Sequence, residues 1–237
     1  MSYGFEYYIM KFIGIELVYV TIIGREGEKM EKKKSEVSEI RTLLENIKKI
    51  SYIKPNELPN IDLYMDQVTT FMDQHLEKTK RYSEDKLLTK TMINNYTKND
   101  LLPSPVKKKY SKDHMVMLIF IYYLKNFLSI TDIQSLVHPM TELFFDEKGE
   151  ISLDEIYAEI YEIEKEQAGS VSRDIIHKAK VAEETFADIK DDEQREYLRK
   201  YAYACLLSYD IYMKRQMLER LIDENFTGRK IEKKEEK

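Results

Sequence analysis

The chain contains little cysteine, glycine or proline, and each scarcity excludes a class of structure. Its 237 residues include one cysteine, Cys205, so no internal disulfide can form, as is typical of the reducing cytoplasm. We expect Cys205 to be a small buried apolar residue rather than a reactive thiol. Seven glycines and five prolines give few turn signals, whereas residues that favour helices are abundant. The composition predicts an all-α chain without a large sheet.

An uncharged hydrophobic run of membrane-spanning length is also missing. Residues 3–23 are apolar over about the right length, but they include Glu6, Lys11 and Glu16. Each of these charges costs about 2.5–3.5 kcal/mol near the centre of a membrane helix. The segment has neither a cationic leader nor a small-residue cleavage site. We therefore expect a cytoplasmic protein without a membrane anchor.

Residues 24–30, Gly-Arg-Glu-Gly-Glu-Lys-Met, indicate where translation starts. Reverse-translated with purine-rich codons, they spell a bacterial ribosome-binding site just upstream of an ATG codon. We therefore expect Met30 to be the first residue, and residues 1–29 to be an extension created by a misplaced start. Residues 30–59 are interpreted as an N-terminal helix, amphipathic over residues 35–50, followed by a linker broken by Pro55 and Pro59.

Groupings of side chains that carry catalysis are not found in the sequence. The four histidines lack a spaced cysteine, serine or carboxylate partner, and the scattered glycines form no phosphate-binding loop. We expect no enzymatic activity, no cofactor and no metal ion.

The charges are distributed unevenly along the chain, and the net charge of −5 conceals this. Residues 78–112 hold ten basic and three acidic side chains, a local net charge of +7. Residues 146–196 hold seventeen acidic and seven basic side chains, a local net charge of −10. This polarity indicates a module that binds a polyanion, joined to a helical region that does not touch it.

A helix is predicted for residues 89–99 within the basic region. Thr89 is its expected N-cap, Met92, Ile93 and Tyr96 its buried stripe, and Asn99 or Asp100 its left-handed C-terminus before Pro103. The remaining side chains are amides, hydroxyls and ammonium groups, which bond phosphates and base edges. Residues 103–110 are stiffened by prolines and cationic, and we interpret them as a wing. The expected DNA-binding residues are Thr89, Lys90, Thr91, Asn94, Asn95, Lys98, Lys107, Lys108, Lys109 and Tyr110.

The order of these parts resembles the MerR-type winged helix-turn-helix. The resemblance rests on Tyr96 followed by the Leu101-Leu102-Pro103 sequence, a basic wing ending in Tyr110, a long helix, and Ser129, Ile130 and Ile133. More closely, residues 61–67, 88–96 and 108–111 resemble the bacterial family of domain of unknown function 1836, over about residues 60–165. The resemblance implies a winged-helix DNA-binding domain at residues 60–140.

Heptad-like apolar seams follow, in a C-terminal helical domain expected at residues 141–228, before a charged tail at residues 229–237. One seam spans residues 175–189 and another residues 198–212. They predict a bundle core, a dimerisation coiled coil, or both. Tyrosines in and around the second seam are candidates to line a pocket for an unknown effector, namely Tyr197, Tyr201, Tyr203, Tyr209 and Tyr212.

These features together predict a transcriptional regulator that binds double-stranded DNA as a homodimer. The alternative is a helical adaptor whose basic patch docks an acidic protein.

Overall fold

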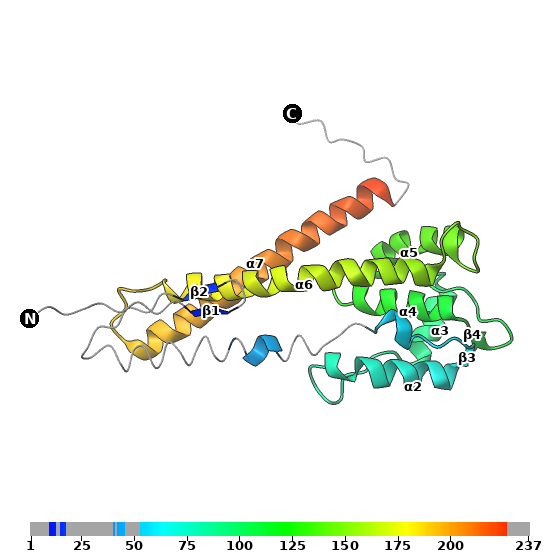
Figure 1. The fold of residues 1–237 in the computed structure, drawn as a ribbon, viewed down its shortest axis with the longest axis horizontal. Coiled ribbons are helices and arrows are strands. Elements are labelled where there is room, and N and C mark those ends of the chain that lie inside the picture. Colours follow the sequence, from blue (N-terminus) through cyan, green and yellow to red (C-terminus); the bar gives the residue numbers. More distant parts are fainter. Residues whose placement is uncertain (1–9, 13–14, 18–39, 41, 46–52, 227–237) are drawn as a thin grey trace, which may run out of the picture. The chain divides into compact units, whose positions relative to one another are not determined.

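The computed structural model describes residues 10–12, 15–17, 40, 42–45 and 53–226, which form parts of two compact units, Met1–Leu43 and Leu44–Lys237 (Figure 1). In the first unit, β1 (Met10–Phe12) pairs antiparallel with β2 (Ile15–Leu17). Ile40 and residues 42–45 are helical, as the amphipathic pattern predicts. The predicted start at Met30 and the tail at residues 229–237 lie outside the described residues.

The second unit is mostly helical, which confirms the predicted fold class at that level. A small antiparallel pairing places Leu63 opposite Tyr110 and Tyr64 opposite Lys109. No helix in the described ranges is both long enough and apolar enough to cross a membrane. Its elements are η1 (Pro55–Glu57), β3 (Leu63–Tyr64), α2 (Met65–Leu76), η2 (Glu77–Thr79), α3 (Lys90–Lys98), β4 (Lys109–Tyr110), α4 (Lys112–Leu124), α5 (Ile130–Phe144), α6 (Leu153–Glu183) and α7 (Asp192–Asn225).

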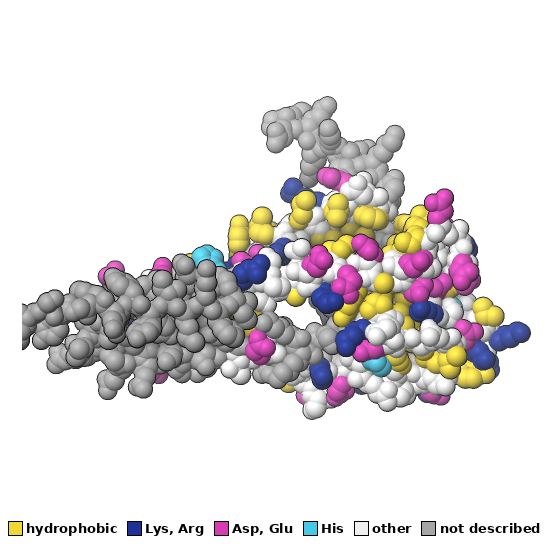
Figure 2. Space-filling view, viewed as in Figure 1, with side chains coloured by type: hydrophobic (Ala, Val, Ile, Leu, Met, Phe, Trp, Pro, Cys, Tyr) yellow, Lys and Arg dark blue, Asp and Glu magenta, His cyan; other side chains and the backbone are white. Residues whose placement is uncertain are grey.

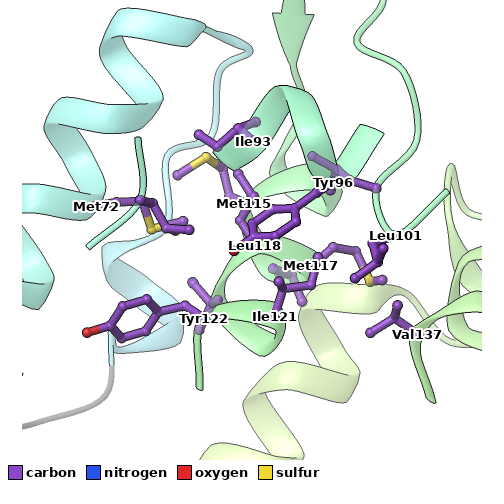
Figure 3. Packing of buried hydrophobic residues seen from close by; sticks show 14 of the residues in the cluster. Met72, Ile93, Tyr96, Leu101, Met115, Met117, Leu118, Ile121, Tyr122 and Val137 are labelled. Atoms are coloured by element: carbon purple, nitrogen blue, oxygen red, sulfur yellow. The ribbon is translucent and has the colours of Figure 1, made fainter. Parts of the chain in front are cut away.

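Helix α4 lies at the centre of this unit, because it is apolar on nearly every side. Its residues 115–119 and Ile121 are fully buried. Figure 3 shows Ile93 and Tyr96 of α3 close to α4, with Met72 of α2 and Val137 of α5 nearby. This core fixes which face of α3 remains exposed.

Serine and threonine side chains set most of the helix starts. The Thr89 hydroxyl oxygen accepts a hydrogen bond from the Met92 amide at 3.2 Å, as predicted, and Ser152 begins α6 in a capping box with Glu155. Ser129 is the N-cap of α5, because its hydroxyl accepts from the Asp132 amide while the Asp132 carboxylate bonds back.

Helices α6 and α7 form an antiparallel pair beyond the central core. The seam at residues 175–189 lies in this contact, where Ala179 and Ala182 are buried and the Tyr203 hydroxyl donates to the Ile175 carbonyl at 3.4 Å. The seam therefore contributes to a helix–helix core within the chain, and its role in dimerisation stays a prediction. The prediction that Cys205 is buried is wrong, since the thiol lies on an exposed part of α7.

Candidate nucleic-acid interface

The exposed face of α3 carries every side chain that the sequence pattern predicts there. Lys90, Thr91, Asn94, Asn95 and Lys98 are exposed, whereas Ile93 and Tyr96 are 0% and 8% exposed. The helix is anchored at its end by Asp100, whose φ of 54° is left-handed, as predicted. The Leu101 amide then donates to the Tyr96 carbonyl at 2.9 Å, and Leu101 and Leu102 turn into the core. The result is a rigid helix with a polar outer face.

A tight hairpin is formed by residues 106–109, within the predicted wing. The Lys109 amide donates to the Val106 carbonyl at 2.9 Å. Lys107 and Lys108, between them, have φ angles of 52° and 67°, the pattern of a type I′ turn. Both side chains are exposed, and neither forms an ion pair with any of the described residues. Two unneutralised cations therefore stand at the tip of the hairpin.

Comparison with known proteins bears on this part of the chain. Residues 53–160 match the family described as Domain of unknown function (DUF1836). The match supports the family resemblance predicted for about residues 60–165, and it includes α2, α3, the hairpin, α4 and α5. No curated protein and no solved structure matches the chain.

Lysines of the DUF1836 segment differ in how far their charges are already neutralised. Lys90 forms an ion pair with Asp66 of α2, and both side chains are largely exposed. The Lys109 ammonium lies over the Tyr64 ring, 5.4 Å from its centroid. Lys98 has no ion-pair partner within residues 53–226. Lys107 and Lys108 on the hairpin and Lys98 on the helix are therefore exposed cations that no carboxylate of residues 53–226 neutralises.

Tyr110 lies in the core of the DUF1836 segment, which corrects its inclusion among the DNA-binding residues. Its side chain is 3% exposed and meets the His114 ring edge to face, with centroids 5.4 Å apart. Burial raises the pKa of its hydroxyl. Tyr110 anchors the hairpin to α4 and does not present its hydroxyl to a ligand.

His114 was not singled out by its sequence pattern, yet it joins the hairpin to the rest of the segment. It is 2% exposed, its Nδ1 accepts from the Ser111 amide at 3.0 Å, and its ring meets Phe145 at 4.8 Å. Nε2 has no partner of hydrogen-bonding geometry. Burial lowers the pKa of His114, and the nearby backbone of Ser104 and the carboxylate of Asp146 partly oppose this. The available signal was Ser-x-x-His, a capping box with histidine at its third position.

Proposed function

We propose that this protein is a transcriptional regulator that binds double-stranded DNA through α3 and the hairpin at residues 106–109. The observation that carries the proposal is the outer face of α3. Its five exposed side chains are two lysines, two asparagines and a threonine, on a helix held rigidly over a buried core. An asparagine amide offers one donor side and one acceptor, which match the edge of adenine in the major groove.

The hairpin contributes the non-specific part of this binding in our proposal. Lysine ammonium groups meet any phosphate equally, and two of them stand unpaired at the tip. Helix α2 packs against both α3 and β4, and all three elements lie toward the same end of the unit in Figure 1. The order β3, α2, α3, hairpin, α4 and α5 supports the MerR-type resemblance.

Replacing Asn94 and Asn95 together by alanine tests the reading of bases. We expect the variant to lose about 1–3 kcal/mol of preference for its site over random duplex, with random binding unchanged. The site is first obtained by selecting bound fragments from genomic DNA, and affinities are then measured by fluorescence anisotropy. Thr70→Ala with Gln74→Ala, exposed positions on α2, is the matched control. Unchanged preference in the asparagine variant would contradict the proposal.

An adaptor that docks an acidic protein is the second candidate. Two exposed apolar side chains near the lysines favour it, since Val106 is 68% and Ile61 69% exposed. Apolar contacts surrounded by charges are typical of protein interfaces. A duplex-binding assay separates the two functions, because an adaptor has no preference among duplex sequences.

A further inference from the structure

A carboxylate stands among the cations of the proposed DNA-binding face. Asp66, in the first turn of α2, forms an ion pair with Lys90, the first residue of α3, and the two side chains are 77% and 58% exposed. In Figure 2, basic side chains project at the end of the second unit where β3 and β4 lie in Figure 1, and acidic side chains lie close by. An exposed carboxylate repels phosphate, so Asp66 opposes the binding of a polyanion to this face.

The start of α2 contacts one lysine from each of the two proposed binding elements. Tyr64 lies opposite Lys109 across the strand pair, and the Lys109 ammonium is 5.4 Å from the centroid of its ring. Asp66 contacts Lys90 of α3. The two partners differ, because a tyrosine ring leaves the ammonium positive whereas a carboxylate neutralises it. Among the lysines expected to bind DNA, Lys90 alone has a carboxylate partner within the part of the chain that the structure describes.

Lys90 also occupies a position from which a recognition helix reads bases. It lies one turn before Asn94 on the exposed face of α3, and the first residues of such a helix reach base edges in the major groove. A lysine there donates to O6 and N7 of guanine. Helix stability does not favour this residue, because the N-terminal end of a helix carries partial positive charge and the first turn of α3 has no acidic residue. We therefore interpret Lys90 as a binding residue.

We propose that Asp66 determines sequence specificity, because it withholds Lys90 from phosphate and reserves it for guanine. A phosphate at Lys90 would also lie close to the Asp66 carboxylate, which repels it. The acceptors of guanine carry no net charge, and an ammonium has three donors, so Lys90 can bond guanine and keep its ion pair. Exposed ion pairs contribute little to stability, so the repulsion matters more here than the strength of the pair. This inference rests on the proposed function, since it concerns the same binding face.

Asp66→Asn in the full chain tests the proposal, with a selected site and random duplex compared by fluorescence anisotropy across salt. We expect the slope of log affinity against log salt to steepen by about 0.9, and random-duplex affinity to rise by up to about eightfold at about 0.1 M salt, since one more phosphate is bound. Affinity for the selected site should rise less, so the preference for it falls.

Two matched variants serve as controls for this substitution. Asp66→Glu keeps the charge and should bind both duplexes as the parent does. Asp73→Asn removes an exposed carboxylate two turns further along α2, one without an ion-pair partner among residues 53–226, and should leave the slope unchanged. If Asp66 had only a structural role at the start of α3, Asp66→Asn would instead weaken the binding of both duplexes.

A Lys90→Gln background separates the effect of pairing from general repulsion by the carboxylate. Asp66→Asn should no longer steepen the slope in this background, because the ammonium that it frees is absent. The parent should lose affinity when 7-deazaguanine, which lacks N7, replaces guanine at one position of the selected site. Lys90→Gln should not respond to the replacement at that position.

Four results would overturn the proposal while DNA binding by α3 and the hairpin still held. They are an unchanged slope in Asp66→Asn, weaker binding of both duplexes by it, a steeper slope that persists without Lys90, and a selected site in which no guanine responds to the replacement. The last measurement uses the parent and decides even if Asp66→Asn misfolds. A parent that binds no duplex would instead refute the proposed function, and this inference with it.

Discussion

The two lysines at the tip of the hairpin have a left-handed backbone conformation, which asparagine and glycine adopt more readily than lysine does. Left-handed φ angles cost a side chain with a Cβ about 1 kcal/mol or more, and type I′ turns prefer Asn-Gly. Lys107 and Lys108 occupy both such positions. Strained backbone of this kind is concentrated at functional sites, and we interpret the two lysines as retained for their charge.

Lys107→Asn with Lys108→Gly separates stability from binding at this turn. We expect the free energy of unfolding to rise by about 1 kcal/mol, because the turn residues now suit the conformation. Duplex affinity should fall at the same time, since two ammonium groups no longer bind phosphate. Urea denaturation and fluorescence anisotropy measure the two effects. Arginine at both positions keeps the charge and the strain, and should change neither the free energy of unfolding nor the duplex affinity. An Asn-Gly variant that binds duplex as tightly as the parent would contradict the account.

His114 should make the protein less stable in acid. Burial lowers its pKa in the folded state below the value of about 6.5 in the unfolded chain. Below about pH 6.5 the unfolded state therefore binds more protons than the folded state. This group lowers the free energy of unfolding by at most about 1.4 kcal/mol for each unit by which the pH decreases. His114→Gln should be less stable at pH 7 but lose less stability than the parent between pH 7 and pH 5 in urea titrations. His138→Gln is the exposed control, expected to follow the parent; equal acid losses in His114→Gln and the parent would refute this role.

At the scale of elements, α6 is a helix whose middle has no packing partner among the described residues. Residues 162–171 are exposed on every side, between the part that contacts α4 and the part that contacts α7. Gly169 lies in this stretch, where helix propensity rather than packing decides stability.

Gly169→Ala and Gly149→Ala should have opposite effects. A Cβ at Gly169 would have its nearest neighbour, the Arg173 side chain, at 3.6 Å, so alanine should stabilise by about 0.5–1 kcal/mol. At Gly149 a Cβ would lie 2.5 Å from Phe144 Cδ1 and 3.0 Å from the Leu143 carbonyl. Alanine there should destabilise by about 1–3 kcal/mol. Thermal unfolding of both variants measures this; stabilisation at both positions would show that the loop before α6 adapts.

The sequence predicted best those features that depend on near neighbours along the chain. The Thr89 cap and the left-handed Asp100 are both local interactions, and both are confirmed. Errors came where tertiary packing decides. Tyr110 was predicted to face DNA but lies in the core, and Cys205 was predicted to be buried but is exposed. Periodicity gives the faces of a helix without showing which neighbour covers each face.

At the scale of the whole molecule, positive and negative charges are concentrated in different regions of the chain. The cationic residues 78–112 carry the proposed DNA-binding face on α3 and the hairpin, whereas the acidic residues 146–196 include all of α6 and the start of α7. The local net charges of +7 and −10 predict that the first of these regions binds a polyanion and the second does not. An acidic helical region avoids phosphate, so duplex should approach the cationic segment alone.

The salt dependence of duplex binding tests the central claim most directly. The parent is compared with a Lys107→Ala, Lys108→Ala, Lys109→Ala variant, and with a control that removes the exposed Lys148, Lys180 and Lys190. We predict that the first variant binds specific and random duplex more weakly by similar factors. Its slope of log affinity against log salt should be shallower by about one for each phosphate that is no longer bound. The control should retain the slope of the parent. Binding of both duplexes by the hairpin variant at parental affinity, with an unchanged slope, would contradict the account.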